Sequence, residues 1–388
     1  MDITIQPGKL CGSIAAIPSK SQAHRLLICA ALANNKTTLI CPETNRDIEA
    51  TADCLNALGA EIVRTQTGYS IDPISNIPER AVLNCCESGS TLRFLLPIVG
   101  ALGVDAVFQM EGRLPQRPLS PLWEEMERMG CRLSRPTGST IRCKGKLQAG
   151  NYVIDGGVSS QFITGLLFAL SLINGKCSLE ITGKVESKPY IDMTKAAMAL
   201  FDAPHYHTPG CLKVEGDWSN GAFWLAAKAL GNPIKVTNLN ACSPQGDRAA
   251  KDLIPALTDS MTIDVSDIPD LVPVLAVVAA ANQGAIFTNI QRLRIKESDR
   301  VATVVEMIVN LGGKAEATED SLTVHGTGLR GGMVSSHNDH RIAMAAAIAA
   351  TVCTEPVTIL GAEAVKKSYP KFWEEYQKLG GRYEQYLR

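Results

Sequence analysis

Four segments place small polar residues directly before an apolar run, three of them with a cation, and this combination suits the binding of anions. They are PSKSQAHR at 18–25, ESGSTLR at 87–93, SSQ at 159–161 and NDHR at 338–341. If each segment opens a helix, free backbone N–H groups and the positive end of the helix dipole lie beside hydroxyl and guanidinium donors. Ordinary N-capping explains any single segment without a ligand. Their recurrence favours a small ligand with more than one anionic group.

Charged residues also cluster at 292–300, directly before a helix expected from Val301. We interpret 292–296 as the end of an alternating strand, so that Lys296 and Glu297 lie at a strand-to-helix corner, where α/β proteins place site residues. A carboxylate among cations can act as general acid or base with a shifted pKa. A solvated edge with salt bridges is the alternative. Asp270, before another apolar run, either caps a helix or transfers a proton.

The helices that must position these residues fall into two classes. One class is apolar nearly all round and should be buried; it is expected at 26–32, 92–102, 162–172, 222–230, 271–281 and 342–352. The other is amphipathic and mostly ends in a glycine suited to a left-handed C-cap; it is expected at 50–59, 122–130 and 301–312, and more weakly near 194–201, 252–257 and 372–380. Short alternating strands follow. About six such units predict an α/β fold with three repeats per domain, apolar helices inside and sheets outside.

Composition limits the class of protein. The chain has 388 residues, with 38 Lys and Arg against 39 Asp and Glu, so we expect two or three domains and no nucleic-acid or membrane partner. The N-terminus lacks the pattern of a signal peptide, and no apolar run is long enough to span a bilayer. The 12 cysteines include no CxxC pair. We therefore expect a cytoplasmic, reduced protein without a bound metal.

Two motif-like features carry no chemistry. GTGLRG at 326–331 matches GxGxxG, but no helix is expected until about Asp339, so we interpret it as a hairpin turn rather than a dinucleotide site. His205 and His207 alternate beside prolines without a third ligand, so a surface strand is favoured over a metal site.

The chain resembles the 5-enolpyruvylshikimate-3-phosphate synthase family in motifs that occur in family order over essentially its whole length. They are the segments at 18–25, 88–93, 117–118, 157–162, 187–190, 268–270, 294–300, 338–341 and 367–370. The resemblance implies the two-domain enolpyruvyl transferase fold, with three βαβαββ repeats in each domain. It implies a discontinuous domain of 1–15 with 215–388, an inserted domain of 16–214, and an active site in the cleft between them. Closure of that cleft by the substrates is expected.

The implied reaction transfers the enolpyruvyl group of phosphoenolpyruvate to the 5-hydroxyl of shikimate 3-phosphate, releases phosphate and belongs to the shikimate pathway. It needs no cofactor, and we expect a monomer. Asp270 would accept the hydroxyl proton, Glu297 would serve the methylene carbon, and Lys20 would bridge both substrates. Shikimate 3-phosphate would bind Lys20, Ser21, Arg25, Ser159, Ser160, Gln161, Ser187, Tyr190, Asp270 and Lys296. Phosphoenolpyruvate would bind Lys20, Gly89, Arg93, Arg117, Gln161, Arg300, Arg341 and Lys367. Gly89 would also leave room for the inhibitor glyphosate.

Three departures from the family pattern leave roles open. His24 replaces a usual Asn, the segment 111–117 before Arg117 is short, and Arg292 occupies a position that is Asn in some members. Two alternative functions are disfavoured. The related transferase acting on UDP-N-acetylglucosamine is disfavoured by Ser21 and the 159–161 block and by the missing loop cysteine. A non-catalytic anion-binding protein is disfavoured because Asp270, Glu297 and Lys20 are all present.

Overall fold

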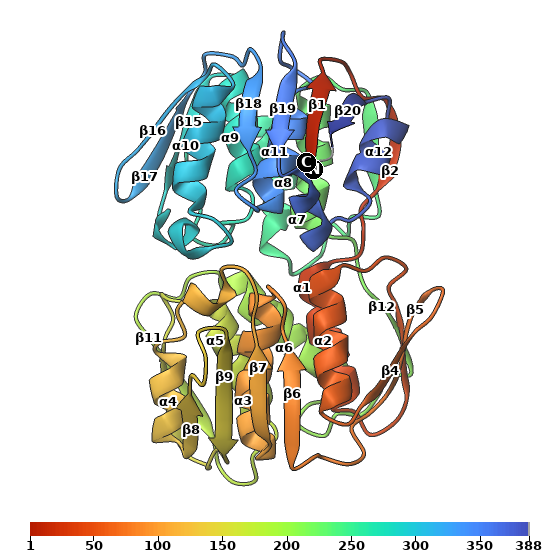
Figure 1. Ribbon diagram of the computed structural model, residues 1–388, viewed down its shortest axis with the longest axis vertical. Helices are drawn as coiled ribbons and strands as arrows, with labels where there is room; N and C mark the ends of the chain where they lie inside the picture. Colours follow the sequence, from red (N-terminus) through yellow and green to blue (C-terminus); the bar gives the residue numbers. More distant parts are fainter. Residues whose placement is uncertain (387–388) are drawn as a thin grey trace. The chain divides into compact units, whose positions relative to one another are not determined.

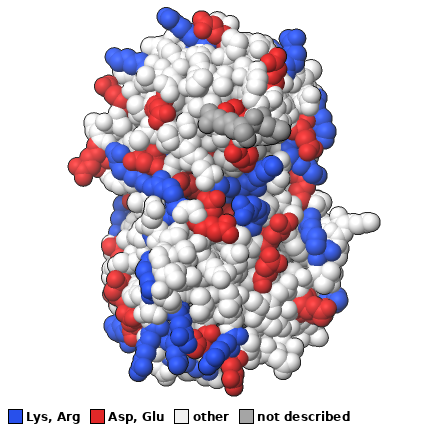
Figure 2. Space-filling model, viewed as in Figure 1, with Lys and Arg blue, Asp and Glu red and all other residues white. Residues whose placement is uncertain are grey.

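The chain divides into two units that have separate hydrophobic cores. The computed structural model describes residues 1–386 (Figure 1). The split unit combines Met1–Ile17 with the segment that begins at Gly216, and the inserted unit is Pro18–Glu215. Lys and Arg are interspersed with Asp and Glu on the face shown in Figure 2, as the formal net charge of −1 leads one to expect.

The inserted unit is mixed α/β. Its helices are α1 (Lys20–Ala31), α2 (Arg46–Ala57), α3 (Gly89–Leu102), η1 (Leu114–Gln116), α4 (Leu122–Arg128), α5 (Ser160–Leu170) and α6 (Lys188–Leu200). Its strands are β3 (Thr37–Ile40), β4 (Glu61–Arg64), β5 (Gly68–Asp72), β6 (Arg80–Asn84), β7 (Asp105–Gln109), β8 (Cys131–Ser134), β9 (Thr140–Gly145), β10 (Asn151–Asp155), β11 (Ser178–Thr182) and β12 (Cys211–Lys213). They form sheets of order β12-β3-β5-β4, β6-β7-β9-β8 and β10-β11.

The split unit is also mixed α/β. Its helices are α7 (Trp218–Ala229), η2 (Gly246–Ala249), α8 (Ala250–Ala256), α9 (Val272–Ala281), η3 (Gln291–Ile295), α10 (Arg300–Asn310), α11 (His340–Ala349), η4 (Ala362–Lys367) and α12 (Phe372–Lys378). Its strands are β1 (Asp2–Gln6), β2 (Gly12–Ala15), β13 (Ile234–Thr237), β14 (Met261–Asp264), β15 (Gly284–Thr288), β16 (Lys314–Ala317), β17 (Ser321–His325), β18 (Gly332–Ser335), β19 (Val357–Leu360) and β20 (Arg382–Tyr386). The sheets are β18-β19-β1-β20, β13-β2 and β14-β15-β17-β16.

Four of the six small sheets described share one topology. In β6-β7-β9-β8, the strands β6 and β7 are parallel, and β9 pairs antiparallel with both β7 and β8. The sheet β14-β15-β17-β16 repeats this pattern. The sheets β10-β11 and β13-β2 contain only a parallel pair. Helices are interleaved with the strands, as parallel pairs require a crossover connection.

The predicted class of buried apolar helices is confirmed for α9 and α11, whereas α7 exposes Lys228 and Ala229. All residues of α11 are buried, and in α9 only the last residue is partly exposed. The amphipathic helices α2, α4 and α10 end before Gly59, Gly130 and Gly312, whose φ angles are 101°, 111° and 82°. Only glycine adopts such angles without strain, so these residues stop the helices as expected. Strands such as β6 and β10 alternate between exposed and buried residues.

Three local predictions are wrong. Residues 291–295 form the 3₁₀ helix η3 rather than a strand end, because Ile290 and Leu293, three residues apart, are both buried as a 3₁₀ turn allows. Residues 326–331 do not form a hairpin turn, since β17 and β18, which they connect, belong to different sheets. His205 and His207 lie in an irregular segment rather than a strand, with stacked rings whose centroids are 5.9 Å apart.

The structure bears on two compositional predictions. No helix in residues 1–386 is long and apolar enough to cross a membrane. All 12 cysteines are unpaired thiols, and seven of them are buried. Cys29, for example, is fully buried, and burial raises the pKa of its thiol, which makes it a packing residue rather than a nucleophile.

Candidate functional site

Arg25 joins three helices of the inserted unit near their N-terminal ends. Its Nε donates to Thr194 Oγ1 at 2.8 Å, and its Nη2 donates to the Tyr190 carbonyl at 2.9 Å and to Thr164 Oγ1 at 3.4 Å. Its Nη1 donates to the Ser21 carbonyl at 2.6 Å, and the guanidinium lies 5.0 Å from the ring centroid of Phe94. Arg25 therefore holds α1, α5 and α6 together through partners that carry no formal charge.

Gln161 connects α5 to α3. Its Oε1 accepts from Arg93 Nη1 at 3.0 Å, and its Nε2 donates to Ser90 Oγ at 3.0 Å. Arg93 Nη2 also donates to the Pro118 carbonyl at 3.0 Å, which ties the segment after η1 to α3. The two helices can approach closely because residue 165 is a glycine. A side chain at this position would overlap the Arg93 carbonyl oxygen. These contacts place the N-terminal ends of α3 and α5 beside Arg93.

Gly89 is the first residue of α3 and lies against two guanidinium groups. A Cβ atom at this position would be 2.6 Å from Nη1 of Arg117 and 2.6 Å from Nη1 of Arg93. Within residues 1–386, the Arg117 side chain forms no hydrogen bond or ion pair, and its Nε is buried. Ser88 caps α3 by accepting from the Thr91 N–H. The result is a helix N-terminus faced by cations, which is an anion-binding arrangement.

Lys20 begins α1 and pairs with Asp47 of α2 at 2.9 Å. His24, one turn later, is fully buried, and its Nδ1 shares a hydrogen bond of 2.7 Å with Thr51 Oγ1. Burial, with the charges of Lys20 and Arg25, lowers the pKa of His24 well below its ordinary value, so this imidazole is neutral. His24 therefore links α1 to α2 without adding charge to the Lys20 region.

The remaining predicted residues of the inserted unit lie at the N-terminal ends of α5 and α6. Ser159 caps α5 by accepting from the Gln161 N–H, and Ser160 is buried. Ser187 precedes α6 with φ of 55°, a left-handed angle that is strained for a non-glycine residue. Such strain recurs at binding sites.

Arg300 organises the predicted residues of the split unit. Only 1% of its side chain is exposed, and its guanidinium donates to three carboxylates: Asp270 at 2.6 Å, Glu297 at 2.6 Å and Asp339 at 2.8 Å. Burial alone would lower the pKa of Arg300. The carboxylates of Asp339, Glu297 and Asp270 outweigh burial and raise this pKa well above its ordinary value. The two predicted proton-transfer residues are thus held on one permanently charged group.

Asp270 receives cations from three directions. Besides Arg300, Arg341 Nη2 lies 3.1 Å and Lys296 Nζ 3.7 Å from its carboxylate oxygens. Burial alone would raise the pKa of Asp270, but Arg341, Lys296 and Arg300 outweigh burial and hold this pKa well below its ordinary value. Helix α9 is capped without a side-chain hydrogen bond, so Asp270 does not serve as its N-cap. Asp270 is an ionised carboxylate whose side chain is 17% exposed.

The pKa of Lys296 is lowered too, but for a lysine this favours the neutral form. Burial lowers its pKa to about 8, an effect that Asp270 opposes and the guanidinium of Arg292 reinforces. A lysine with this pKa exchanges protons near neutral pH and gains charge when an anion approaches. Asp339 caps α11 through the Arg341 N–H, and Lys367 Nζ donates to the Asn338 carbonyl at 2.8 Å. Arg341 and Lys367 therefore both lie at the N-terminal end of α11.

Asp247 in η2 was not identified from the sequence. It is 2% exposed, it accepts a hydrogen bond from Ser219 Oγ, and its Oδ1 has no partner within residues 1–386. Burial, followed by the charge of Asp270, raises the pKa of Asp247 to about 7, and Arg341 opposes this effect. No periodic pattern marks this residue, because it lies in a short 3₁₀ turn. The only available signal is an acid between a Ser-Pro turn and a helix.

Known sequences and structures match the whole chain. Residues 5–258 and 254–376 match the family described as EPSP synthase (3-phosphoshikimate 1-carboxyvinyltransferase). The chain belongs to the EPSP synthase family. The 3-phosphoshikimate 1-carboxyvinyltransferase of Clostridium kluyveri is 39% identical, over 99% of this chain and 98% of the relative. That of Clostridium acetobutylicum is also 39% identical, over 98% and 97%. The resemblance to the EPSP synthase family is therefore confirmed.

The fold of EPSP synthases is also matched. The solved structure of EPSP synthase from Acinetobacter baumannii superposes with a TM-score of 0.80 at 20% identity, over 99% of this chain and 100% of that one. A mixed α/β fold with six small sheets is thus shared with this EPSP synthase. The individual roles predicted for the site residues stay predictions.

Proposed function

We propose that the protein transfers the enolpyruvyl group of phosphoenolpyruvate to the 5-hydroxyl of shikimate 3-phosphate and releases phosphate, as an enzyme of the shikimate pathway. Membership of the EPSP synthase family supports this reaction. The observation that carries the proposal is the cluster around Arg300, which holds two carboxylates on one buried guanidinium beside Lys296 and Arg341. The reaction requires a proton acceptor and a proton donor beside anionic substrates, and this cluster contains both types of group.

The inserted unit contributes binding groups in this proposal. Residues in or near the first turns of α1, α5 and α6 hold shikimate 3-phosphate. They are Lys20, Ser21, Arg25, Ser159, Ser160, Gln161, Ser187 and Tyr190. Most N–H donors of Arg25 already bind protein acceptors. Arg25 therefore acts mainly by its charge and by fixing α1, α5 and α6, while the hydroxyls supply direct contacts.

Phosphoenolpyruvate requires cations for a carboxylate and a phosphate. We assign Lys20, Arg93 and Arg117 beside Gly89 and Gln161 in the inserted unit, and Arg300, Arg341 and Lys367 in the split unit. Arg117 lacks a protein partner among the described residues, so its donors are available to the ligand. Because both units contribute cations, the substrates would draw them together and exclude water from the reacting groups. In this proposal the two units are the two domains of an enolpyruvyl transferase fold, each built on three βαβαββ repeats.

Asp270 accepts the proton of the 5-hydroxyl as the oxygen attacks C2 of phosphoenolpyruvate. In the substrate-free protein this carboxylate is a weak base, because three cations stabilise its ionised form. Substrate anions that bind Arg341 and Lys296 share those cations and so raise the pKa of Asp270. Substrate binding thereby strengthens the base at the moment when it is needed.

Glu297 serves the methylene carbon, C3. Glu297, after taking a proton from solvent, gives it to C3 during addition; as the carboxylate it then removes a proton from C3 during elimination, while the phosphate leaves C2 with its bonding electrons. Arg300 contacts Glu297 at 2.6 Å and so sets its position and its charge together with those of Asp270. The side chain of Glu297 is 27% exposed, more than that of Asp270, so it is the more accessible of the two for proton exchange with solvent.

A phosphate-release assay tests the proposal. Release should require both shikimate 3-phosphate and phosphoenolpyruvate, and omission of either should reduce it to background. Robust turnover with UDP-N-acetylglucosamine as acceptor would instead identify the related transferase. Substrate binding by calorimetry without turnover on either acceptor would identify a non-catalytic anion-binding protein.

A further inference from the structure

A pocket in the split unit lies between α7, α8 and the end of α9, among residues to which the proposed reaction gives no role. Its volume is about 390 Å³, within the range of small-molecule sites. The lining consists of Leu225, Lys228, Ala229, Ala250, Lys251, Ile254, Pro255, Thr258 and Asn282. None of these residues belongs to the cluster around Arg300. The pocket is therefore separate from the candidate active site in the residues that form it.

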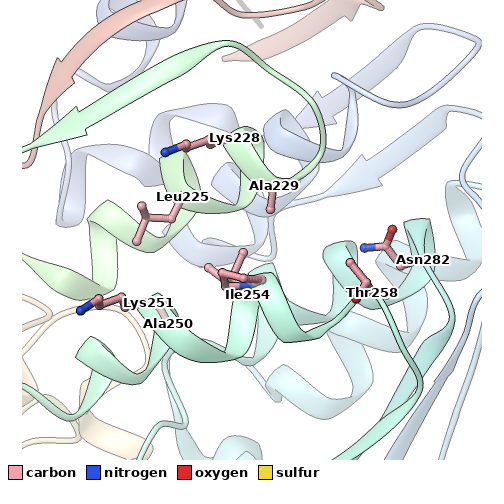
Figure 3. Close-up of a pocket in the computed structure, with 9 residues that line it drawn as sticks. Leu225, Lys228, Ala229, Ala250, Lys251, Ile254, Thr258 and Asn282 are labelled. Carbon is pink, nitrogen blue, oxygen red and sulfur yellow. The ribbon is translucent and has the colours of Figure 1, made fainter.

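The lining is divided by chemistry. Figure 3 shows Lys228 of α7 and Lys251 of α8 at one end with Leu225 between them, Thr258 and Asn282 at the other end, and Ile254 between the two ends. Ile254 and Ala250 are covered by protein, so the apolar surface that the pocket offers comes mainly from Leu225, Ala229 and Pro255, which are partly or fully exposed. An apolar body fits there, with a polar group at the far end if the ligand carries one.

The two lysines give the pocket a charge preference. The lining contains two lysines and no acidic residue. Within residues 1–386, neither lysine side chain forms an ion pair or a hydrogen bond. Their charges are thus uncompensated by the protein, on adjacent helices and at the same end of the pocket (Figure 3). A carboxylate at this end of the pocket is attracted by both charges.

We propose that this pocket binds a small carboxylate with an apolar, ring-sized body. The carboxylate lies near Lys228 and Lys251, and the body lies on Leu225, Ala229 and Pro255. An uncharged analogue of the same shape loses the lysine contacts and binds more weakly. This inference is independent of the proposed function.

Calorimetry with 3-phenylpropanoate as probe tests the inference. For a ligand of this size a Kd of about 0.1–1 mM is expected. The measurement belongs at about 20 mM salt, where exposed charges are little screened. The amide 3-phenylpropanamide is the matched uncharged probe, and it should bind about fivefold more weakly, since the exposed charge contacts that it lacks contribute about 1 kcal/mol in total.

Variants locate the binding. The double variant Lys228→Gln with Lys251→Gln should lose about fivefold in affinity. Ala229→Phe, at an exposed position of the lining, should block the pocket. Lys235→Gln removes an equally exposed charge of the same unit outside the lining, and it should leave the Kd unchanged. All of these variants should fold and keep wild-type phosphate release.

Three results would overturn the inference. One is the absence of saturable binding at millimolar probe. Another is a Kd that the double lysine variant and Ala229→Phe leave unchanged. The third is complete displacement of the probe by phosphoenolpyruvate, which would place the carboxylate on the cations proposed for the active site. Binding that survives saturating phosphoenolpyruvate and falls in both variants supports the pocket.

Discussion

The arginines of the two units have different partners. In the inserted unit, Arg25 donates to hydroxyl and carbonyl oxygens, and Arg117 has no partner among the described residues. In the split unit, Arg300 and Arg341 donate to carboxylates. Neutral partners fix a guanidinium but leave its charge available to a ligand. With carboxylate partners, the charge of the guanidinium instead stabilises the ionised form of those carboxylates.

This difference separates binding from proton transfer. A cation with neutral partners is prepared for an anion before the anion arrives. A cation paired with carboxylates must be shared when the anion arrives, and this sharing changes the pKa of the carboxylates. Among the predicted site cations of the inserted unit, Lys20 differs, since it pairs with Asp47. It is also the residue to which we assign contacts with both substrates.

The largest expected effect comes from replacing the two buried arginines. Arg300→Met leaves Asp270, Glu297 and Asp339 without their shared cation, and should lower the free energy of unfolding by about 3–5 kcal/mol and abolish turnover. Arg25→Met leaves only neutral acceptors unpaired and should cost about 1–3 kcal/mol. Urea denaturation measures both values. An equal or greater loss for Arg25→Met would contradict the distinction between the two kinds of partner.

The buried carboxyl of Asp247 should make the stability of the protein depend on pH. The pKa of Asp247 is raised to about 7 from the ordinary 3.8, so between these values the folded protein binds more protons than the unfolded chain. The contribution of Asp247 to stability therefore falls as pH rises from about 4 to about 7. Asp247→Asn removes this term, so its stability relative to wild type should increase over that window.

The exposed Asp252 on α8 provides the control for this measurement. Asp252→Asn should shift the denaturation midpoint by the same amount at every pH. If Asp247→Asn behaves like this control, Asp247 is not a carboxyl whose proton is retained on folding.

The binding of shikimate 3-phosphate should depend on pH through Lys296. Its pKa of about 8 means that the substrate-free protein loses this charge as pH rises, while a bound anion requires it. The Kd for shikimate 3-phosphate should therefore rise about fivefold between about pH 8 and 9. Lys296→Arg keeps the charge over this range and should flatten the profile. Parallel pH profiles of the Kd for wild type and Lys296→Arg would show that Lys296 does not bind shikimate 3-phosphate.

The smallest effect is expected at Gly89. The Cβ of Gly89→Ala would meet Arg117 and Arg93 at 2.6 Å, so both guanidinium groups must shift by part of an ångström. A displaced charge–anion contact should raise the KM for phosphoenolpyruvate about threefold to tenfold, with kcat nearly unchanged. Glyphosate inhibition should weaken in the same variant. A fall in kcat at constant KM would show that Gly89 acts in the chemical step instead.

Much of the fold was predictable because local signals agree. The apolar runs that became α9 and α11 have no polar face, and the glycines after α2, α4 and α10 mark where those helices end. The 3₁₀ helix η3 was mistaken for a strand because Arg292, Leu293 and Arg294 alternate in polarity over too short a stretch to separate the two periods.

The site was predictable in its members but not in its connections. Family motifs supplied Asp270, Glu297 and Arg300. The joint attachment of Asp270 and Glu297 to Arg300 depends on segments that only the tertiary structure brings together. Asp247 shows the limit more sharply. Its raised pKa comes from burial and from a carboxylate 23 residues away in sequence, and neither is visible in the residues around it.

The most direct test of the account is single-turnover phosphate release by Asp270→Asn with both substrates bound. The amide keeps the size of the side chain but cannot accept the hydroxyl proton. We expect calorimetry to show shikimate 3-phosphate bound within about threefold of wild type, and phosphate release to be slower by about 100-fold or more. Release at the wild-type rate from the bound variant would contradict the role of Asp270 as the base.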